Sequence, residues 1–218
     1  MSLKNIMANS NCIVSVSFRE PYLTHSKKQE EVVRGFSVDC DLMYFRDELP
    51  TAKGIVRENI VAEFQKSLYG FKPHAIQKAI DAGYKKVIWF DPSVLPAVSP
   101  QILFDSLDEH PMIVRAGEHP LKKMCSVVAQ RWMDISDKEM ESLKHIGGTI
   151  YGFNFSNAKS AEVFKLWIKL EEIGLFGTQD DFMAGHWADE SCMALALHKC
   201  WVPQYWEEKF TYLNQKEL

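Results

Sequence analysis

The sequence has little that would place the protein on nucleic acid or in a membrane. Lys and Arg number 25 against 29 Asp and Glu, a net charge of −4, so we expect no basic surface for following a phosphate backbone. No segment approaches the run of about 20 apolar residues that spans a bilayer. The opening residues, MSLKNIMANSN, lack the basic start and long apolar stretch of a secretory signal. We therefore expect a cytoplasmic protein with no transmembrane segment and no nucleic-acid partner.

Cysteine is scarce and shows no pairing pattern. The five cysteines are odd in number and share no C-x-x-C spacing: Cys12, Cys40, Cys125, Cys192 and Cys200. Neither a disulfide framework nor a structural zinc site is therefore indicated. We expect reduced, mostly buried thiols.

What is present is an ordinary globular composition in which strand-like and helix-like segments alternate. Of the 218 residues, 46% are hydrophobic and 25% are charged, enough for one sizeable core. Apolar runs predict strands at 12–18, 41–45 and 87–90, and apolar spacing predicts helices around Val32–Phe36, at 57–68 and at 73–82. This alternation predicts an α/β fold with a central, mostly parallel sheet flanked by helices.

The second half of the chain is less regular. It predicts a helix at 100–107, a short strand at 112–116, a polar or helical stretch around Trp132, and a glycine-opened strand at 147–155. Ser156 or Asn157 then caps an apolar helix that Gly174 ends, and a dense acidic loop leads into a last helix near 193–197. No repeat or linker interrupts the chain, so we expect a single domain over residues 1–218.

Asp91 is among the best-placed carboxylates of the sequence. It follows the unbroken apolar run Val87-Ile88-Trp89-Phe90 and is followed by Pro92-Ser93. Ligands of open parallel sheets bind beyond the carboxyl ends of the strands, which favours a functional carboxylate there. The alternative is that Asp91 only caps the turn, as aspartate commonly does.

The order of these parts resembles that of nucleotide-diphospho-sugar transferases of the GT-A fold. The resemblance lies in the first strand with Ser15 and Ser17 towards its end, Tyr-Gly-Phe-Lys-Pro (69–73) before a helix, and the strand that ends in Asp-Pro-Ser (91–93). A Gly-Gly strand, a helix that carries Trp167 and a late acidic helix start complete it. It covers about residues 12–199. It implies a nucleotide-binding part near 12–98, an acceptor part near 99–218, and transfer of a sugar from a nucleotide diphosphate, with UDP favoured, to a carbohydrate or glycan hydroxyl.

The resemblance also implies a divalent metal. In that family the strand ends in Asp-x-Asp, whose two carboxylates hold Mn²⁺ or Mg²⁺ against the diphosphate. Here Asp91 matches the first position and Ser93 replaces the second carboxylate. One carboxylate, diphosphate oxygens and waters can suffice for Mg²⁺-type coordination, so we expect a weak, donor-assisted metal site.

Several side chains are candidates for the donor. Lys72 precedes the 73–82 helix, where a cation and a helix N-terminus both suit phosphate; we expect it to have little packing to lose, although it can equally be a plain exposed lysine. Arg19 follows the first strand and is a second cation for the same phosphate. Tyr22 and Tyr69 are candidates for stacking on the base, or simply pack. Ser17, with Ser15, can offer a hydroxyl to the nucleotide.

The late acidic segment supplies the candidates for catalysis. Asp189 and Glu190 best match the family's carboxylate, which serves as base in inverting enzymes and lies beneath the sugar in retaining ones. The sequence leaves both routes open. Asp180 and Asp181 compete for the role, and all four carboxylates can instead complement a helix dipole.

Four further residues are candidates for the sugar and acceptor. His186 stands three residues before Asp189, a spacing that places both on one helix face as a metal pair or, more simply, in a polar contact. Trp187 is a candidate for stacking on a sugar ring. Arg115 and Asn154 are candidates for holding sugar hydroxyls or phosphate, unless they only satisfy backbone groups.

Two other functions remain open on sequence alone. Phosphatases and phosphotransferases also end a buried strand in aspartate, which they use as a covalent nucleophile, although Asp91 lies far from the chain start and lacks their Asp-x-Asp-x-Thr pattern. The third possibility is a non-catalytic module that binds nucleotide sugars.

Overall fold

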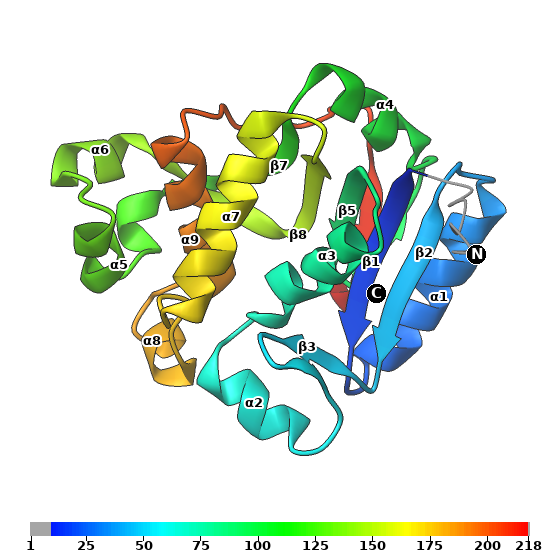
Figure 1. Cartoon of the computed structure of the whole chain (residues 1–218), viewed down its shortest axis with the longest axis horizontal. Coiled ribbons are helices and arrows are strands. Elements are labelled where there is room, and N and C mark those ends of the chain that lie inside the picture. Colours follow the sequence, from blue (N-terminus) through cyan, green and yellow to red (C-terminus); the bar gives the residue numbers. More distant parts are fainter. Residues whose placement is uncertain (1–9, 218) are drawn as a thin grey trace, which may run out of the picture.

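The computed structural model describes residues 10–217 and contains a mixed five-stranded sheet (Figure 1). The order across the sheet is β2 (Asp41–Arg46), β1 (Asn11–Ser17), β5 (Lys86–Phe90), β8 (Lys144–Asn154) and β7 (Met112–Pro120). β1 pairs in parallel with β2 and β5, whereas β8 is antiparallel to both β5 and β7. Four strands therefore run in one direction and β8 runs against them, which confirms the predicted α/β fold with a mixed, mostly parallel sheet.

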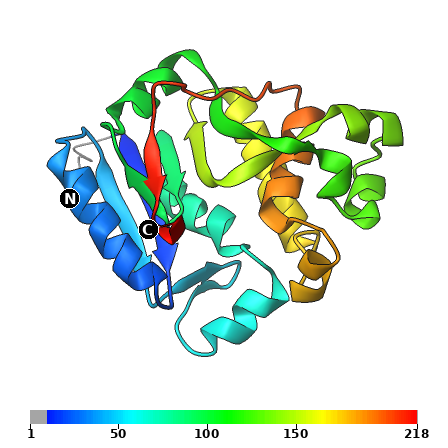
Figure 2. The same cartoon turned by 180° about the vertical axis from the view of Figure 1, so that it is seen from behind.

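Helices cover both faces of this sheet, as the opposite views of Figures 1 and 2 show. One hydrophobic core joins the sheet to α3 (Phe71–Asp81), α7 (Ala158–Glu172) and α9 (Ala188–Lys199), and a second joins it to α1 (Tyr22–Gly35) and α4 (Gln101–Glu109). Side chains of β5 alternate between the two cores: Val87 and Trp89 pack in the first, and Ile88 and Phe90 pack in the second. Its unbroken apolar run reflects this burial on both faces.

Short elements complete the chain. β3 (Leu49–Thr51) and β4 (Gly54–Val56) form a hairpin before α2 (Ile60–Lys66), and β6 (Val94–Pro96) pairs with β9 (Tyr212–Asn214). The remaining turns are η1 (Leu121–Lys123), α5 (Val127–Trp132), α6 (Asp137–Ser142), α8 (Gln179–Met183) and η2 (Gln215–Glu217). The sequence did not predict either small pair of strands, because segments of three residues carry too little periodicity.

Most predicted boundaries are right to within a few residues, with three corrections. The helix expected from Arg57 begins only at Ile60. Pro73 is the third residue of α3 rather than its first, since the helix starts at Phe71. The acidic segment expected as a loop is the helix α8, whose start is closed by a capping box between Thr178 and Asp181.

The carboxyl ends of β1 and β5 and the start of α9 meet at one edge of the sheet. The Asp91 amide, just beyond β5, donates to the Thr149 carbonyl of β8 at 2.8 Å. The neighbouring residue, Gly148, is hydrogen-bonded to Glu190 in the first turn of α9. The end of β5, the middle of β8 and the start of α9 are thereby joined at the carboxyl ends of the parallel strands, where α/β sheets bind ligands.

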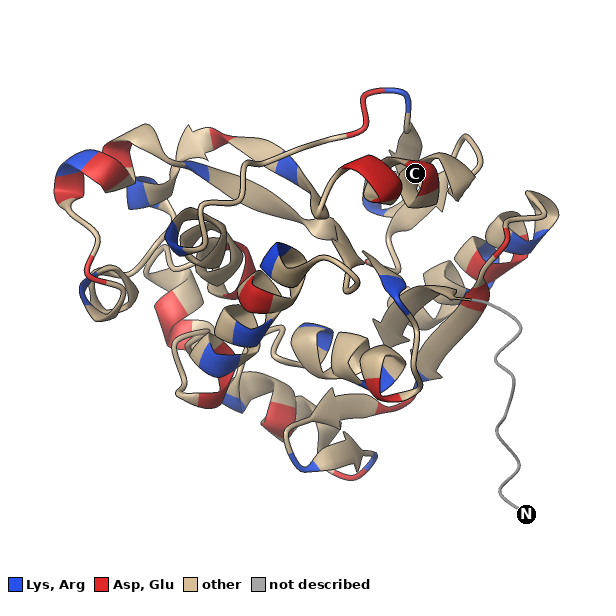
Figure 3. Cartoon of the chain, turned by 45° about the horizontal axis from the view of Figure 1, so that its top comes forward, with Lys and Arg blue, Asp and Glu red and all other residues tan. Residues whose placement is uncertain are grey.

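The surface and the thiols agree with the composition. Figure 3 shows acidic and basic residues interspersed over the helices. The cysteines all lie in the described part of the chain and are free. Within residues 10–217, no helix combines the length and the apolar character that crossing a bilayer requires.

Candidate functional site

A pocket at the carboxyl ends of β1 and β5, here called the Asp91 pocket, collects most of the residues predicted for the donor. Ser17 closes β1, Tyr22 opens α1, Tyr69 precedes α3 and Asp91 follows β5. The lining comprises Val16, Ser17, Phe18, Arg19, Tyr22, Phe64, Tyr69, Phe71, Asp91, Pro92 and Lys216. One wall is aromatic, and the charged groups are two cations and one carboxylate.

Arg19 and Ser17 face this pocket with polar groups. The Arg19 guanidinium lies 5.4 Å from the centre of the Phe64 ring and 5.9 Å from that of Tyr22, so aromatic faces hold an exposed cation in place. The Ser17 hydroxyl is buried and, like that of Ser15, has no hydrogen-bond partner within the described chain. A buried hydroxyl without a partner carries an energetic cost that a polar ligand can relieve.

Asp91 combines the two roles that its sequence position left open. Its Oδ1 accepts from the Ser93 amide at 2.9 Å and from the Ser93 hydroxyl at 2.6 Å, which closes the turn after β5. The same carboxylate lines the pocket, and its charge acts on Lys72, Glu190 and Lys216. Asp91 is therefore a turn cap that also presents negative charge to the site.

Lys216 is a charged residue of the site that the sequence analysis missed. It lies in η2, beyond the resemblance, with its Nζ 5.2 Å from the centre of the Tyr22 ring. Burial alone would lower the pKa of Lys216, but Asp91, Tyr22 and Tyr69 together outweigh burial and raise the pKa, so the ammonium form is favoured. No sequence signal marks this lysine, because only the β6–β9 pairing brings it beside Asp91.

Lys72 is placed differently from its prediction. It is 3% exposed, and its Nζ donates to Asp189 Oδ2 at 2.7 Å and to the Gly148 carbonyl at 3.0 Å. The rings of Tyr69, Trp89 and Tyr151 surround the ammonium at 4.8–5.7 Å. The expectation of a cation with little packing to lose is wrong, since α3 buries its second residue against β8 and α9.

Lys72, Tyr151, Asp189 and Glu190 form a group that we call the Lys72 cluster. Asp189 Oδ2 accepts from the Tyr151 hydroxyl at 2.8 Å as well as from Lys72. Burial raises the pKa of Asp189, and the two donors reduce this rise without cancelling it. The 2.7 Å contact with the Lys72 ammonium is the geometry of an ion pair. For Lys72, burial alone would lower the pKa, but the charges of Asp189, Asp91 and Glu190 together raise it.

Glu190 is the member of this cluster that has a carboxylate oxygen without a hydrogen-bond partner. Its Oε1 accepts from the Gly148 amide at 2.8 Å, whereas Oε2 is buried without a partner among residues 10–217. Burial, followed by the charge of Asp189, raises the pKa of Glu190 to about 7. A carboxylate with such a pKa can accept or release a proton near neutral pH.

Gly148 joins the cluster to the pocket and leaves no room for a side chain. A Cβ on Gly148 would lie 2.7 Å from Glu190 Oε1 and 2.8 Å from Lys72 Nζ, whereas a Cβ on Gly147 would meet nothing within 4 Å. The following residue, Thr149, accepts from the Asp91 amide. The absence of a side chain at Gly148 therefore lets the backbone of β8 approach both Glu190 and Lys72.

The donor set at Asp91 does not fit a resident metal ion. Ser93 is 1% exposed, and its hydroxyl proton is directed at Asp91, which leaves one side-chain oxygen of Asp91 for a metal. Lys216 lines the same pocket, and the charge of Asp91 raises its pKa, so a metal ion there would compete with an ammonium for the carboxylate. Over the described chain, no three His, Cys, Asp or Glu side chains are grouped so that they could hold a metal ion.

The predicted sugar and acceptor residues divide between the site and the rest of the fold. Trp187 lies just before α9, is 37% exposed and packs beside His145. Arg115 is exposed and lies 3.4 Å from the Tyr212 hydroxyl. That hydroxyl lies 3.2 Å from the Thr149 hydroxyl. Trp187 and Arg115 both remain near the site. Asn154 does not, because it pairs with the first residue of β5 at the opposite edge and donates to the Leu107 carbonyl at 2.7 Å.

His186, Asp180 and Asp181 serve local structure. Buried His186 accepts from the Ser126 amide at 3.1 Å and donates to the Leu175 carbonyl at 2.7 Å, so both ring nitrogens are used; burial lowers its pKa. Asp181 accepts from the Thr178 amide at 2.7 Å, as its alternative role at a helix start predicts. Asp180 is exposed in the same first turn of α8.

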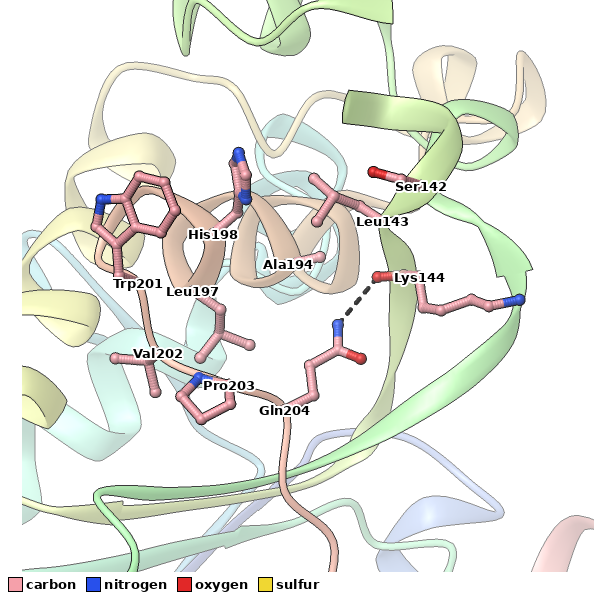
Figure 4. A pocket seen from close by; sticks show the side chains of 10 residues that line it. All are labelled: Ser142, Leu143, Lys144, Ala194, Leu197, His198, Trp201, Val202, Pro203 and Gln204. Atoms are coloured by element: carbon pink, nitrogen blue, oxygen red, sulfur yellow. Dashed lines mark hydrogen bonds between the residues drawn. The ribbon is translucent and has the colours of Figure 1, made fainter. Parts of the chain in front are cut away.

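A second pocket, shown in Figure 4, contains none of the predicted residues. It lies between the end of α9, the segment 201–204 and the start of β8. Leu143, Ala194, Leu197 and Val202 form its apolar surface. It has no carboxylate, and it is lined by the second half of α9, whereas Glu190 lies in the first turn.

No family model and no curated protein matches the sequence. Among solved structures, the galactosyltransferase LgtC with donor and acceptor sugar analogs is 13% identical over 80% of this chain and 69% of its own, with a TM-score of 0.41. A glycosyltransferase involved in the glycosylation of the major capsid of PBCV-1 is 14% identical over 78% and 69%, with a TM-score of 0.45. A Desulfovibrio desulfuricans G20 protein assigned as a nucleotide-diphospho-sugar transferase is 13% identical over 91% and 80%, with a TM-score of 0.47.

The α/β fold itself is established by the strands and helices of this chain.

Proposed function

We propose that the protein transfers a sugar from a nucleotide-diphosphate donor to a hydroxyl of a carbohydrate acceptor. The observation that carries the proposal is the junction of two unlike sites. An aromatic pocket with two cations is joined, through Thr149 and Gly148, to a carboxylate whose pKa is about 7. The first site suits a nucleotide, and the second suits proton transfer.

In this proposal the Asp91 pocket binds the donor. Tyr22 and Tyr69 offer ring faces to the base, and Arg19 and Lys216 offer charged donors to the diphosphate. Tyr69 adopts a φ of 60°, which is uncommon for a bulky residue, and its ring lies between the pocket and the Lys72 ammonium. A uridine nucleotide is the first donor to examine.

The transfer step needs one bond broken, one bond formed and one proton accepted. The bond between sugar C1 and the diphosphate oxygen breaks, and its electron pair stays on that oxygen. The acceptor oxygen bonds to C1 and loses its proton to Glu190 Oε2, the buried oxygen that has no partner. Asp189 stays ionised and paired with Lys72, so the two neighbouring carboxylates have different roles.

The experiment is a screen followed by one substitution. Binding of nucleotide sugars should raise the melting temperature of the protein, because a ligand that binds only the folded state stabilises it. With a donor identified, Glu190→Gln should reduce kcat for transfer by about 10²- to 10⁴-fold and leave donor binding nearly unchanged. Equal transfer by wild type and Glu190→Gln would remove Glu190 from the reaction.

The same assays separate the alternatives. A non-catalytic module would bind a nucleotide sugar without turnover. A phosphotransferase would form a phosphoenzyme on Asp91, for which the structure offers little support, because Ser93 holds Oδ1 with two hydrogen bonds.

A further inference from the structure

We propose that Lys216, rather than a metal ion held by carboxylates, neutralises the leaving diphosphate in this protein. The inference rests on the proposed function, since it requires a nucleoside diphosphate in the Asp91 pocket. It replaces the expectation that Asp91 and Ser93 hold Mn²⁺ or Mg²⁺.

The first argument is the position of Lys216, which the hydrogen bonds of the preceding residue, Gln215, hold in place. Gln215 is 6% exposed, and its side-chain amide donates to the Pro92 carbonyl at 3.1 Å and to the His25 carbonyl at 3.2 Å. Its backbone amide donates to the Ser93 carbonyl at 2.7 Å. Gln215 thus ties η2 to the turn after β5 and to α1, and places the next residue over the pocket.

The second argument is charge. The charged residues that line the pocket are Arg19, Lys216 and Asp91, so the pocket carries a net positive charge that a diphosphate complements. A divalent cation on Asp91 would share the pocket with the Arg19 and Lys216 cations, which would repel it. The turn itself needs Asp91, because Asp91 holds Ser93.

The chemical step requires no further reactant. As the bond from C1 to the diphosphate oxygen breaks, negative charge develops on that oxygen, and an ammonium N–H of Lys216 donates to it. Lys216 keeps its proton. The proton of the acceptor hydroxyl goes to Glu190, as above.

The experiment compares binding of UDP and UMP by calorimetry, in EDTA and in excess Mn²⁺, for wild type and three variants. In EDTA, wild type should bind UDP, and Lys216→Met should weaken UDP binding by about 10- to 100-fold while UMP binding changes little. The matched control is Lys165→Met, an exposed lysine of α7 away from the pocket, which should behave as wild type.

Asp91→Asn gives a result of opposite sign under the two hypotheses. If Lys216 provides the counter-charge, Asp91→Asn should tighten UDP binding in EDTA, because a negative charge next to the diphosphate is removed. If Asp91 holds a metal, the same substitution should weaken UDP binding in Mn²⁺.

Two outcomes would overturn the inference: UDP binding that requires Mn²⁺, or equal UDP affinity in Lys216→Met and Lys165→Met. Failure of the proposed function looks different. In that case UDP, ADP, GDP and CDP would all fail to bind wild type, with or without Mn²⁺.

Discussion

The Asp91 pocket and the Lys72 cluster are neighbours, and both contain lysine and carboxylate, yet their charges are arranged in opposite ways. In the cluster, the Lys72 ammonium lies 2.7 Å from Asp189, and the side chains of both residues are at most 3% exposed. In the pocket, Arg19 and Lys216 are exposed, and within the described residues no carboxylate lies within ion-pair distance of either.

This difference separates a structural role from a binding role. A buried ion pair is costly to break, because the remaining charge has no water around it, so the Lys72 cluster fixes how α3, β8 and α9 meet. Exposed cations cost little to keep unpaired, so those of the pocket are available to a ligand. Glu190 lies between these cases, buried but with one oxygen free of partners.

The largest effect should come from breaking the buried pair. Lys72→Met leaves Asp189 ionised and uncompensated in the core, and we expect a loss of about 3–5 kcal/mol in the free energy of unfolding, measured by urea denaturation. Lys122→Met is the control, because Lys122 pairs with Glu141 at 2.8 Å at the surface; it should cost less than about 1 kcal/mol. Similar losses in both would mean that the buried pair contributes no more than a surface pair.

The next effect concerns pH and Glu190. Its folded pKa of about 7 lies above the ordinary 4.5, so between these values the folded state binds the extra proton. Protonation of Glu190 therefore stabilises the folded state, and this stabilisation is complete below pH 4.5 and is lost as pH rises through about 7. Over this interval the free energy of unfolding should fall by at most about 1.4 kcal/mol per pH unit.

Denaturation at a series of pH values measures this contribution as the difference between wild type and Glu190→Gln. Transfer activity should rise with pH over the same interval, because the base must be deprotonated. Identical pH dependence of stability in both proteins would show that Glu190 has an ordinary pKa.

The smallest effect should come from Gly148, which lies between the Asp91 pocket and the Lys72 cluster. Gly148→Ala places a methyl group against Glu190 and Lys72 and should cost about 1–3 kcal/mol in stability. If the Gly148 hydrogen bond to Glu190 is weakened, the midpoint of the activity profile should move to higher pH, because that bond lowers the Glu190 pKa. Gly147→Ala, which meets nothing within 4 Å, should change stability by less than about 1 kcal/mol and leave the midpoint in place.

Local pattern was enough to predict the frame of the molecule. β1, β2, β5, α4 and α7 lie close to their predicted positions, because each has an apolar period or a cap of its own. The same pattern placed Ser17 and Asp91 at strand ends, and both line one pocket.

The sequence by itself thus determined the α/β class, the apolar strands and the polar residues at their ends, since these depend on periodicity over a few neighbouring residues. Tertiary structure alone decided that Lys72 is buried against Asp189, that Glu190 differs from its neighbour, and that Lys216 returns to the pocket. The reason is physical: pairing, desolvation and pKa depend on contacts between segments that are far apart in the chain, and those contacts exist only once the helices have packed on the sheet.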